Sequence, residues 1–270
     1  MPGSSNGIER NQAFVFGEVA DGYERTRPSY PEALFDDVLE YCAKATPRIL
    51  EIGAGTGKAT VSLAKRGVAV VALEPSAEMA EIAKSNLADF DNAKVVEMTF
   101  EGWPEGGAPF DAIVAAQAWH WAEDGKYERA HRVLGPGGVL AAFWNRAVWP
   151  EHQLAMRAAV EGVYLELEPQ LLDAPAAFPG LVPYGRERVC AAELEASPLF
   201  DSPTRAEYGR STTYSLSSYI DLLGTQSMHR MLEPDRRGRL MAAIAGALET
   251  FGDSIDVEIE TRLVMARRLP

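Results

Sequence analysis

A short apolar strand that runs into a glycine-rich turn is the feature that most restricts the fold of this chain. Residues 48–52 read Arg-Ile-Leu-Glu-Ile, and the next five read Gly-Ala-Gly-Thr-Gly. A helical pattern over 59–66 follows directly. Glycines at such a turn permit positive φ and let the backbone approach a ligand closely. The pattern therefore predicts a ligand site at Gly53, Gly55 and Gly57, against the alternative of a turn without a ligand.

Strands and helices alternate on both sides of this turn. Further strands are predicted over 68–73, 94–98, 112–116 and 138–144, and helices over 31–43, 77–88 and 127–134. Near-continuous apolar runs are typical of parallel strands that are buried on both faces. The chain therefore predicts an α/β fold with a Rossmann-like, mostly parallel sheet. Ligands of such sheets bind beyond the carboxyl ends of the strands.

The pattern changes after Pro150. We predict a helix over 151–167, an irregular Pro- and Ala-rich stretch over 168–183, a strand over 207–214, helices over 217–223 and 234–251, and a final strand over 256–266. The predicted organisation is a flexible lead-in (1–11), a ligand-binding Rossmann-like core (12–150), a helical lid or substrate cap (151–230), and a closing helix and antiparallel strand of the core (231–270). The lid is expected because loops alone rarely need so many residues.

The charge and the cysteine content restrict the partners. With a net charge of -13, most of the surface would repel DNA or RNA, so nucleic acid is not an expected partner. No apolar run has membrane-spanning length, and the first residues lack a signal-peptide pattern, so we expect a cytoplasmic protein without a membrane partner. The expected assembly is a monomer or homodimer. Cys42 and Cys190 do not form a metal motif, and we predict no metal site. The cluster of Arg236, Arg237 and Arg239 favours a solvated helix face, with anion binding as the alternative.

The residues around the glycine turn indicate which kind of nucleotide cofactor it would bind. Glu74 ends the second strand about twenty residues beyond Gly53, where a carboxylate can accept hydrogen bonds from ribose hydroxyls. The alternative role for Glu74 is a carboxylate that interacts with a helix N-terminus. A dinucleotide fingerprint would need glycine at Lys58, and a phosphate-binding loop would need glycine at Ile52 and Ser or Thr at Ala59. NAD is therefore the secondary interpretation, and ATP or GTP is disfavoured.

Several separate segments together resemble the class I S-adenosylmethionine-dependent methyltransferases, especially the type 11 and trans-aconitate-methyltransferase-like small-molecule group. The segments are 50–57, 72–76, 110–121 and 132–138, in the order and spacing of the family. The resemblance covers about residues 12–150 and is loose in the tail. It implies methyl transfer from S-adenosylmethionine to a small molecule, with a carboxylate or hydroxyl oxygen expected first and nitrogen or sulfur left open. The alternatives are an NAD-dependent oxidoreductase and a non-catalytic cofactor-binding regulator.

The resemblance also implies which residues bind the cofactor. The backbone of 53–57 and of Gln117 would hold the methionine moiety, Glu74 the ribose, and Pro75 the adenine. Thr99 stands where the family commonly has an aspartate, so the second adenine contact moves to Phe100 and Glu101. The full set comprises Tyr23, Arg27, Glu51, Gly53, Ala54, Gly55, Gly57, Glu74, Pro75, Phe100, Glu101, Gln117 and Ala118. Arg27 would pair with the cofactor carboxylate, or else lie on the surface.

Aromatic residues mark the expected acceptor side. His120, between Trp119 and Trp121, is the histidine placed to face an acceptor. It is either a general base or a neutral member of an aromatic wall. Trp144 ends the next strand, and Asn145 and Arg146 follow it. With the two tryptophans beside His120, these three are the expected acceptor-binding residues. Arg146 would then recognise an acidic substrate, or else lie on the surface.

Overall fold

Parallel strands alternate with helices in the first part of the chain. The structure is a computed structural model that describes residues 28–172 and 185–270. Its first elements are α3 (Glu32–Cys42), β1 (Arg48–Ile52), α4 (Lys58–Ala64), β2 (Ala69–Leu73), α5 (Ala77–Asn86), β3 (Ala93–Val96), β4 (Phe110–Ala116), the 3-10 helix η2 (Trp119–Trp121), α6 (Lys126–Val133) and β5 (Leu134–Val148). These elements lie where the sequence predicts them, except that η2 was not predicted and β5 is longer at both ends.

The second part of the chain differs more from the prediction. Its elements are η3 (Glu151–Gln153), α7 (Leu154–Leu167), η4 (Pro169–Leu171), α8 (Arg186–Ala196), β6 (Thr204–Ser215), α9 (Leu216–Gly224), α10 (Ser227–Arg230), α11 (Pro234–Glu249) and β7 (Ser254–Arg267). Neither α8 nor α10 was predicted. The missed signal for α8 is its composition of Ala, Glu, Leu and Arg, which are strong helix formers. The predicted irregular stretch over 168–183 begins with η4, and its residues from 173 onward lie outside the described residues.

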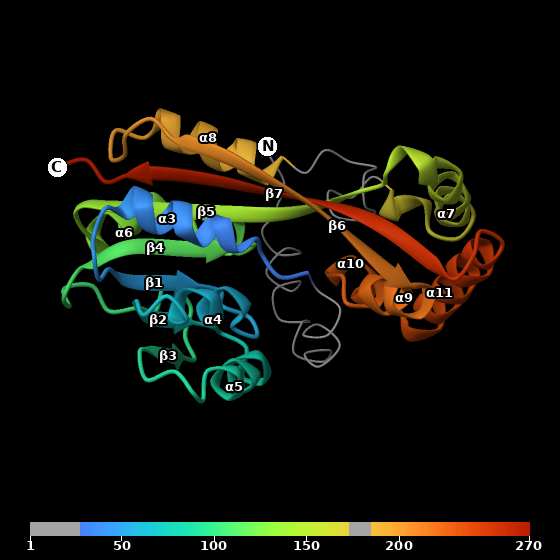
Figure 1. Ribbon diagram of the computed structural model, residues 1–270, viewed down its shortest axis with the longest axis horizontal. Coiled ribbons are helices and arrows are strands. Elements are labelled where there is room, and N and C mark those ends of the chain that lie inside the picture. The colour runs from blue at the N-terminus through green and yellow to red at the C-terminus, as the bar shows by residue number, and fades with distance from the viewer. Residues whose placement is uncertain (1–27, 173–184) are drawn as a thin grey trace. The chain divides into compact units, whose positions relative to one another are not determined.

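The described strands form one seven-stranded sheet in the order β3-β2-β1-β4-β5-β7-β6 (Figure 1). The pairs β3-β2, β2-β1, β1-β4 and β4-β5 are all parallel. β7 runs antiparallel to β5, since Arg268 bonds to Gly138 and Thr261 bonds to Asn145. The predicted α/β sheet with an antiparallel closing strand is therefore confirmed.

The strand order places the candidate site. β1 has β2 on one side and β4 on the other, so the chain changes its winding direction at β1. Such a switch point leaves a crevice beyond the carboxyl ends of the strands. Ile52 at the end of β1 pairs with Leu73 at the end of β2, which brings the turns that follow the two strands together.

Two compact units divide the described residues, and β5, β6 and β7 each contribute to both. The sheet unit comprises 29–145, 185–208 and 261–270. In its core, α3 and α4 pack on one face of the sheet through Phe35, Val38 and Leu63, among others. Phe143 of β5 contacts Tyr30 and Phe35 edge-on, with ring centroids 4.9 and 5.9 Å apart. Such aromatic pairs each add about 0.5–1.5 kcal/mol to the effect of burial.

The second unit is mainly helical and includes 146–172 and 209–260. α7, α9 and α11 share a core that contains Val160, Tyr219 and Ile244. The sequence assigned α11 to the closing part of the sheet core, whereas its apolar face packs with the helices of this unit. The predicted role of 151–230 as a lid stays a prediction.

One arginine of the cluster in α11 makes an ion pair that the sequence did not predict. Arg236 donates from Nε and Nη2 to the carboxylate of Glu168, at 2.9 and 2.7 Å, and Glu168 is only 3% exposed. The side chain of Arg236 is nevertheless 48% exposed, in agreement with the predicted solvated helix face. Residues 68 positions apart in the chain make this pair, so no local pattern could have indicated it.

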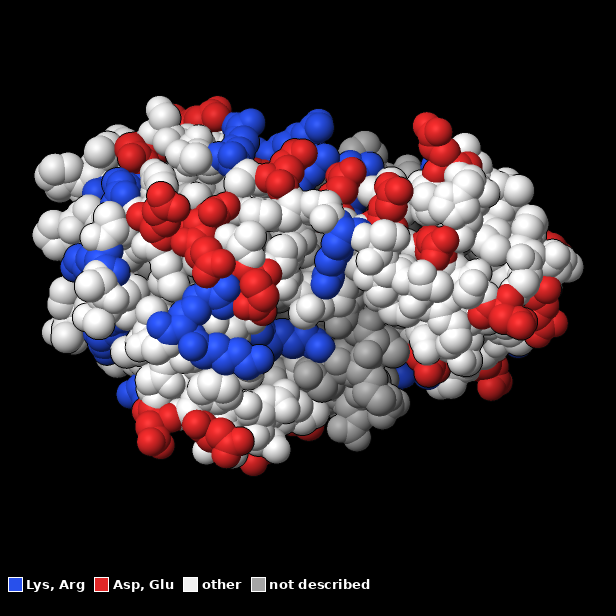
Figure 2. Space-filling view, viewed as in Figure 1, with Lys and Arg blue, Asp and Glu red and all other residues white. Residues whose placement is uncertain are grey.

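Opposite charges are interspersed on the surface of the sheet unit. Figure 2 shows acidic side chains over α3 beside basic side chains over α4. Arg66, two residues after α4, pairs with Glu32 and Asp36 of α3 at 2.6 and 2.7 Å. Exposed pairs of this kind contribute little to stability. In the described ranges, none of the helices combines the length and the hydropathy that a membrane crossing requires.

Candidate functional site

The turn between β1 and α4 has three glycines in the left-handed region, with φ of 64° at Gly53, 58° at Gly55 and 85° at Gly57. A Cβ at Gly53 would lie 2.6 Å from the Cβ of Ala118, which is too close for two carbon atoms. At Gly55, no heavy atom of the described residues, apart from Gly55 itself and its two chain neighbours, would lie within 4 Å of a Cβ. Packing within the protein therefore requires Gly53, whereas Gly55 borders open space at the strand ends.

Glu74, directly after β2, is bound to this turn. Its Oε2 accepts the backbone N–H of Gly55 at 2.7 Å, and its Oε1 accepts the backbone N–H of Ser76 at 2.9 Å. The residue is 7% exposed, and its burial raises the pKa of the carboxyl while the two N–H groups act in the opposite direction. Each oxygen retains acceptor capacity, so the carboxylate can also bind hydroxyl groups.

Glu51 lies at the base of the same turn and is fully buried. Its Oε2 accepts the hydroxyl of Thr60 at 2.6 Å, whereas no described residue donates to its Oε1. Burial, and then the nearby charge of Glu74, raise the pKa of Glu51 to about 8, while the Thr60 hydrogen bond lowers it. A buried carboxyl oxygen without a donor is costly, which is typical of a place that a ligand completes.

The turn after β4 meets the glycine turn. Gln117 has a φ of 61°, and its backbone N–H donates to the carbonyl of Phe143 at 2.8 Å. A non-glycine residue in this region is strained, and such residues are often found at functional sites. Ala118 follows and contacts Gly53. The structure therefore brings together the predicted cofactor-binding residues of β1, β2 and β4.

His120 is oriented by Trp144. The indole N–H of Trp144 donates to Nδ1 of His120 at 3.3 Å, because an indole nitrogen can only donate. In the neutral ring the proton of His120 must then be on Nε2. A general base would need to take its proton at Nδ1 and lose the contact with Trp144. The geometry therefore favours a donor role for His120 over the role of a base.

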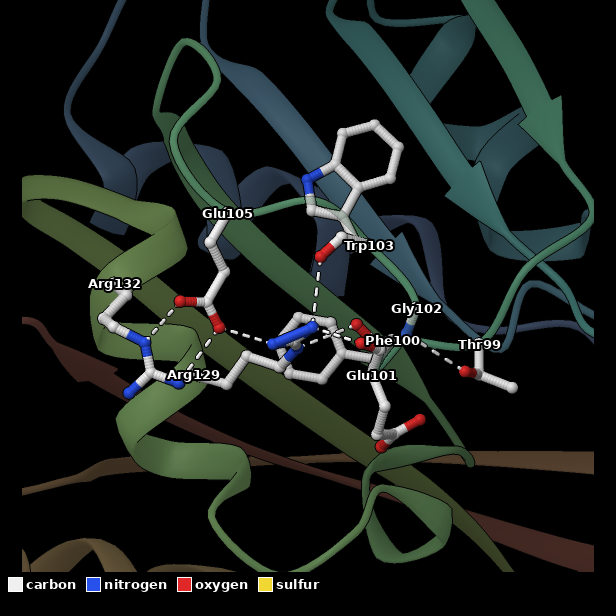
Figure 3. A network of polar contacts seen from close by, with 8 residues as sticks. All are labelled: Thr99, Phe100, Glu101, Gly102, Trp103, Glu105, Arg129 and Arg132. Atoms are coloured by element: carbon white, nitrogen blue, oxygen red, sulfur yellow. Dashed lines mark hydrogen bonds and ion pairs between the residues drawn. The ribbon is translucent and has the colours of Figure 1, made fainter.

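The loop after β3 carries the expected adenine contacts (Figure 3). Phe100 is 3% exposed, and its ring lies 6.1 Å from that of Trp119. Oε1 of Glu101 accepts the backbone N–H of Glu123 at 2.9 Å. Phe100 and Trp119 are thus core residues of the sheet unit, and Glu101 is held at its side chain.

Some predicted site residues serve other contacts. The amide of Asn145 donates to the carbonyl of Ser29 at 3.1 Å and accepts the hydroxyl of Thr261 at 2.6 Å. Arg146 belongs to the helical unit, where it lies 3.6 Å from Glu260. Tyr23 and Arg27 lie outside the described residues. The acceptor roles of Asn145 and Arg146 stay predictions.

The structure also places one residue that sequence analysis missed. The guanidinium of Arg186, at the start of α8, lies 5.4 Å from the ring centroid of Trp121. A cation over an indole face depends on tertiary packing, so no pattern in the sequence indicates it. Within the described ranges, no group of three or more His, Cys, Asp and Glu side chains is arranged to hold a metal ion.

Comparison with known proteins gives the family of this site. Residues 49–138 match the profile of a family described as "Methyltransferase domain". The chain is 39% identical over 137 residues to an uncharacterized methyltransferase of Mycobacterium tuberculosis, across 50% of this chain and 54% of that protein. Residues 49–138 form a methyltransferase domain.

Two further proteins resemble larger parts of the chain around this methyltransferase domain. An uncharacterized methyltransferase of Bacillus licheniformis is 30% identical over 148 residues, which are 52% of this chain and 66% of that protein. A solved structure from Anaeromyxobacter dehalogenans, described as a "Putative Type II Methyltransferase", matches 90% of this chain and 99% of its own chain, at 26% identity and a TM-score of 0.59. The predicted fold is confirmed, and the matched domain supports the predicted class I methyltransferase family, whereas the type 11 and trans-aconitate-methyltransferase-like subgroup stays a prediction. The chain spans about half the length of the first of these curated relatives, 54%.

Proposed function

We propose that this protein transfers a methyl group from S-adenosylmethionine to a small molecule. The observation that carries the proposal is the hydrogen bond from Gly55 to Glu74, which holds a carboxylate beside the open side of the glycine turn. A ribose needs such an acceptor, and the methionine end needs a turn that side chains do not fill. The methyltransferase domain supports the same activity.

Each part of the cofactor has a matching group. The backbone of 53–57 and of Gln117 would hold the methionine moiety. Oε1 of Glu51, which has no donor among the described residues, would accept a hydrogen bond from the ammonium group or from a water molecule bound to it. Glu74 would bind the ribose, and Pro75, Phe100 and Glu101 would contact the adenine.

Methyl transfer mainly requires that the acceptor atom is aligned with the methyl group of the cofactor. The cofactor supplies a methyl group on a positively charged sulfur; the acceptor oxygen forms the new C–O bond as the C–S bond breaks and its electron pair stays on sulfur. A carboxylate acceptor has no proton to lose, whereas a hydroxyl passes its proton to water or to a base. The protein therefore has to orient the acceptor and exclude water. The Nε2–H of His120 would orient an acceptor oxygen, and this favours an oxygen acceptor with a free lone pair.

Two other functions differ in what they bind and turn over. An NAD-dependent oxidoreductase is disfavoured because Lys58 begins α4 where the dinucleotide fingerprint has its third glycine. Thermal-shift titration with S-adenosylmethionine, S-adenosylhomocysteine and NAD separates the two, and stabilisation by NAD alone would refute the proposal. A non-catalytic binding protein would bind S-adenosylmethionine without turnover. Transfer of a labelled methyl group to any member of a pooled metabolite set excludes that alternative.

A further inference from the structure

One guanidinium holds the loop after β3 onto α6 (Figure 3). Nε of Arg129 donates to the carbonyl of Phe100 at 2.9 Å, and its Nη2 donates to the carbonyls of Glu101 and of Trp103, the latter at 3.1 Å. Its Nη1 pairs with the carboxylate of Glu105. The side chain of Arg129 thus binds three carbonyl groups within residues 100–103 and the carboxylate of Glu105 at the end of the same loop.

These contacts need an arginine. A guanidinium is a planar fork of N–H donors and can bind several acceptors at fixed angles, whereas an ammonium is a point charge. The side chain of Arg129 is only 18% exposed, so water competes weakly for these bonds. The hydroxyl of Thr99 accepts the N–H of Gly102 at 3.2 Å, which closes the turn whose carbonyls face α6.

Two of the three carbonyl groups that Arg129 binds belong to the residues that are expected to contact adenine. Arg129 binds the carbonyls of both Phe100 and Glu101, and its guanidinium lies 5.6 Å from the ring of Phe100. Glu101 is held a second time, because its side chain accepts the N–H of Glu123. These hydrogen bonds from Arg129 fix the backbone at Phe100 and Glu101, and the positions of both side chains therefore depend on Arg129.

We propose that Arg129 is the positioning residue for adenine recognition. It holds the loop so that Glu101 can accept the adenine amino group, and it does so without touching the cofactor. This inference rests on the proposed function, because it requires an adenosine cofactor in the site.

Arg132 provides a matched control on the same helix. Among the described residues it donates to Glu105 alone, at 2.6 and 3.0 Å, and it binds none of the loop carbonyls. Replacing Arg132 therefore weakens the ion pairs with Glu105 but leaves the hydrogen bonds from Arg129 to Phe100 and Glu101 intact.

The experiment compares two ligands on four proteins. Calorimetry gives the Kd of S-adenosylhomocysteine and of S-inosylhomocysteine, in which a carbonyl replaces the adenine amino group, for wild type, Arg129→Ala, Arg129→Lys and Arg132→Ala. We expect wild type and Arg132→Ala to prefer S-adenosylhomocysteine by about tenfold or more, since the analogue leaves an acceptor without its donor. In both Arg129 variants the preference should fall below about threefold, mostly through weaker binding of S-adenosylhomocysteine.

The outcomes separate this inference from the proposed function. A wild type that binds neither ligand refutes the proposed function itself. A wild type that binds both ligands equally, or a folded Arg129→Ala that keeps the wild-type preference, overturns the role of Arg129 while the methyltransferase proposal stands. If Arg129→Ala does not fold, Arg129→Lys decides, because it keeps a positive charge beside Glu105 but cannot bind three carbonyls at once. Loss of the fold in both variants also overturns the inference, since Arg129 would then serve the stability of the domain.

Discussion

The backbone N–H of Gly55 and the carboxylate of Glu74 are joined by a hydrogen bond of 2.7 Å. The two residues belong to the turns that follow adjacent parallel strands, β1 and β2. The bond fixes the open glycine of the first turn to the buried carboxylate of the second. A ligand that binds beside Gly55 therefore has the carboxylate of Glu74 next to it in a fixed position.

Glu74→Gln should weaken the binding of S-adenosylhomocysteine by about 1.5–3 kcal/mol, because a neutral amide replaces a charged hydrogen-bond acceptor. Calorimetry measures the change. Glu78→Gln is the control, since Glu78 lies in the first turn of α5 and is exposed. Unchanged affinity in a folded Glu74→Gln protein would remove Glu74 from the site.

Gly53→Ala and Gly55→Ala should differ in how much they destabilise the protein. Both residues have positive φ, so each change costs about 1–2 kcal/mol of unfolding free energy. Gly53→Ala should lose about 1–3 kcal/mol more, because its new Cβ would meet Ala118. Denaturant unfolding measures this difference.

The ligand affinities of the same pair should show the complementary result. Gly55→Ala places a methyl group on the open side of the turn, so the Kd of S-adenosylhomocysteine should rise by about tenfold or more in a protein that is still folded. Equal stabilities for the two variants, or wild-type affinity in Gly55→Ala, would contradict this assignment of the turn.

Glu51→Gln should change how stability depends on pH. The pKa of Glu51 in the folded protein is about 8, above its ordinary value of 4.5. Below pH 4.5 the group is protonated in both states; between pH 4.5 and 8 only the unfolded chain loses the proton, so the wild type loses stability as pH rises. Relative to wild type, Glu51→Gln should therefore gain up to about 1.4 kcal/mol per pH unit across this window.

Urea unfolding at several pH values between 5 and 8 tests the effect of Glu51. Glu97→Gln, at an exposed position, is the control and should follow the wild type. A constant difference between Glu51→Gln and wild type over this range would show that Glu51 is ionised in the folded protein.

The tautomer of His120 is a further measurable property. Nitrogen chemical shifts should show Nε2–H in wild type, because Trp144 donates to Nδ1. Trp144→Phe removes that donor, and the ring should then populate both tautomers, while the signals of His131, His152 and His229 stay unchanged. A wild-type ring with its proton on Nδ1 would exclude the contact with Trp144 and restore the case for a general base.

Local patterns in the sequence were enough to predict the elements around the glycine turn and their order. Apolar runs, turn glycines and helical spacing act over a few residues, so β1, the turn and α4 are readable without the structure. Glu74 and Gln117 are readable too, because each follows a buried strand and parallel strands end at one edge of the sheet.

The contacts between distant side chains follow from the folded arrangement of whole elements. Arg129 binds a loop that lies 26 to 29 residues earlier in the chain, and Arg236 reaches Glu168 across 68 residues. His120 gains its orientation from Trp144 on the neighbouring strand β5. Such contacts depend on strand order and on the packing of whole elements, to which many residues contribute together, so no short pattern in the sequence encodes them.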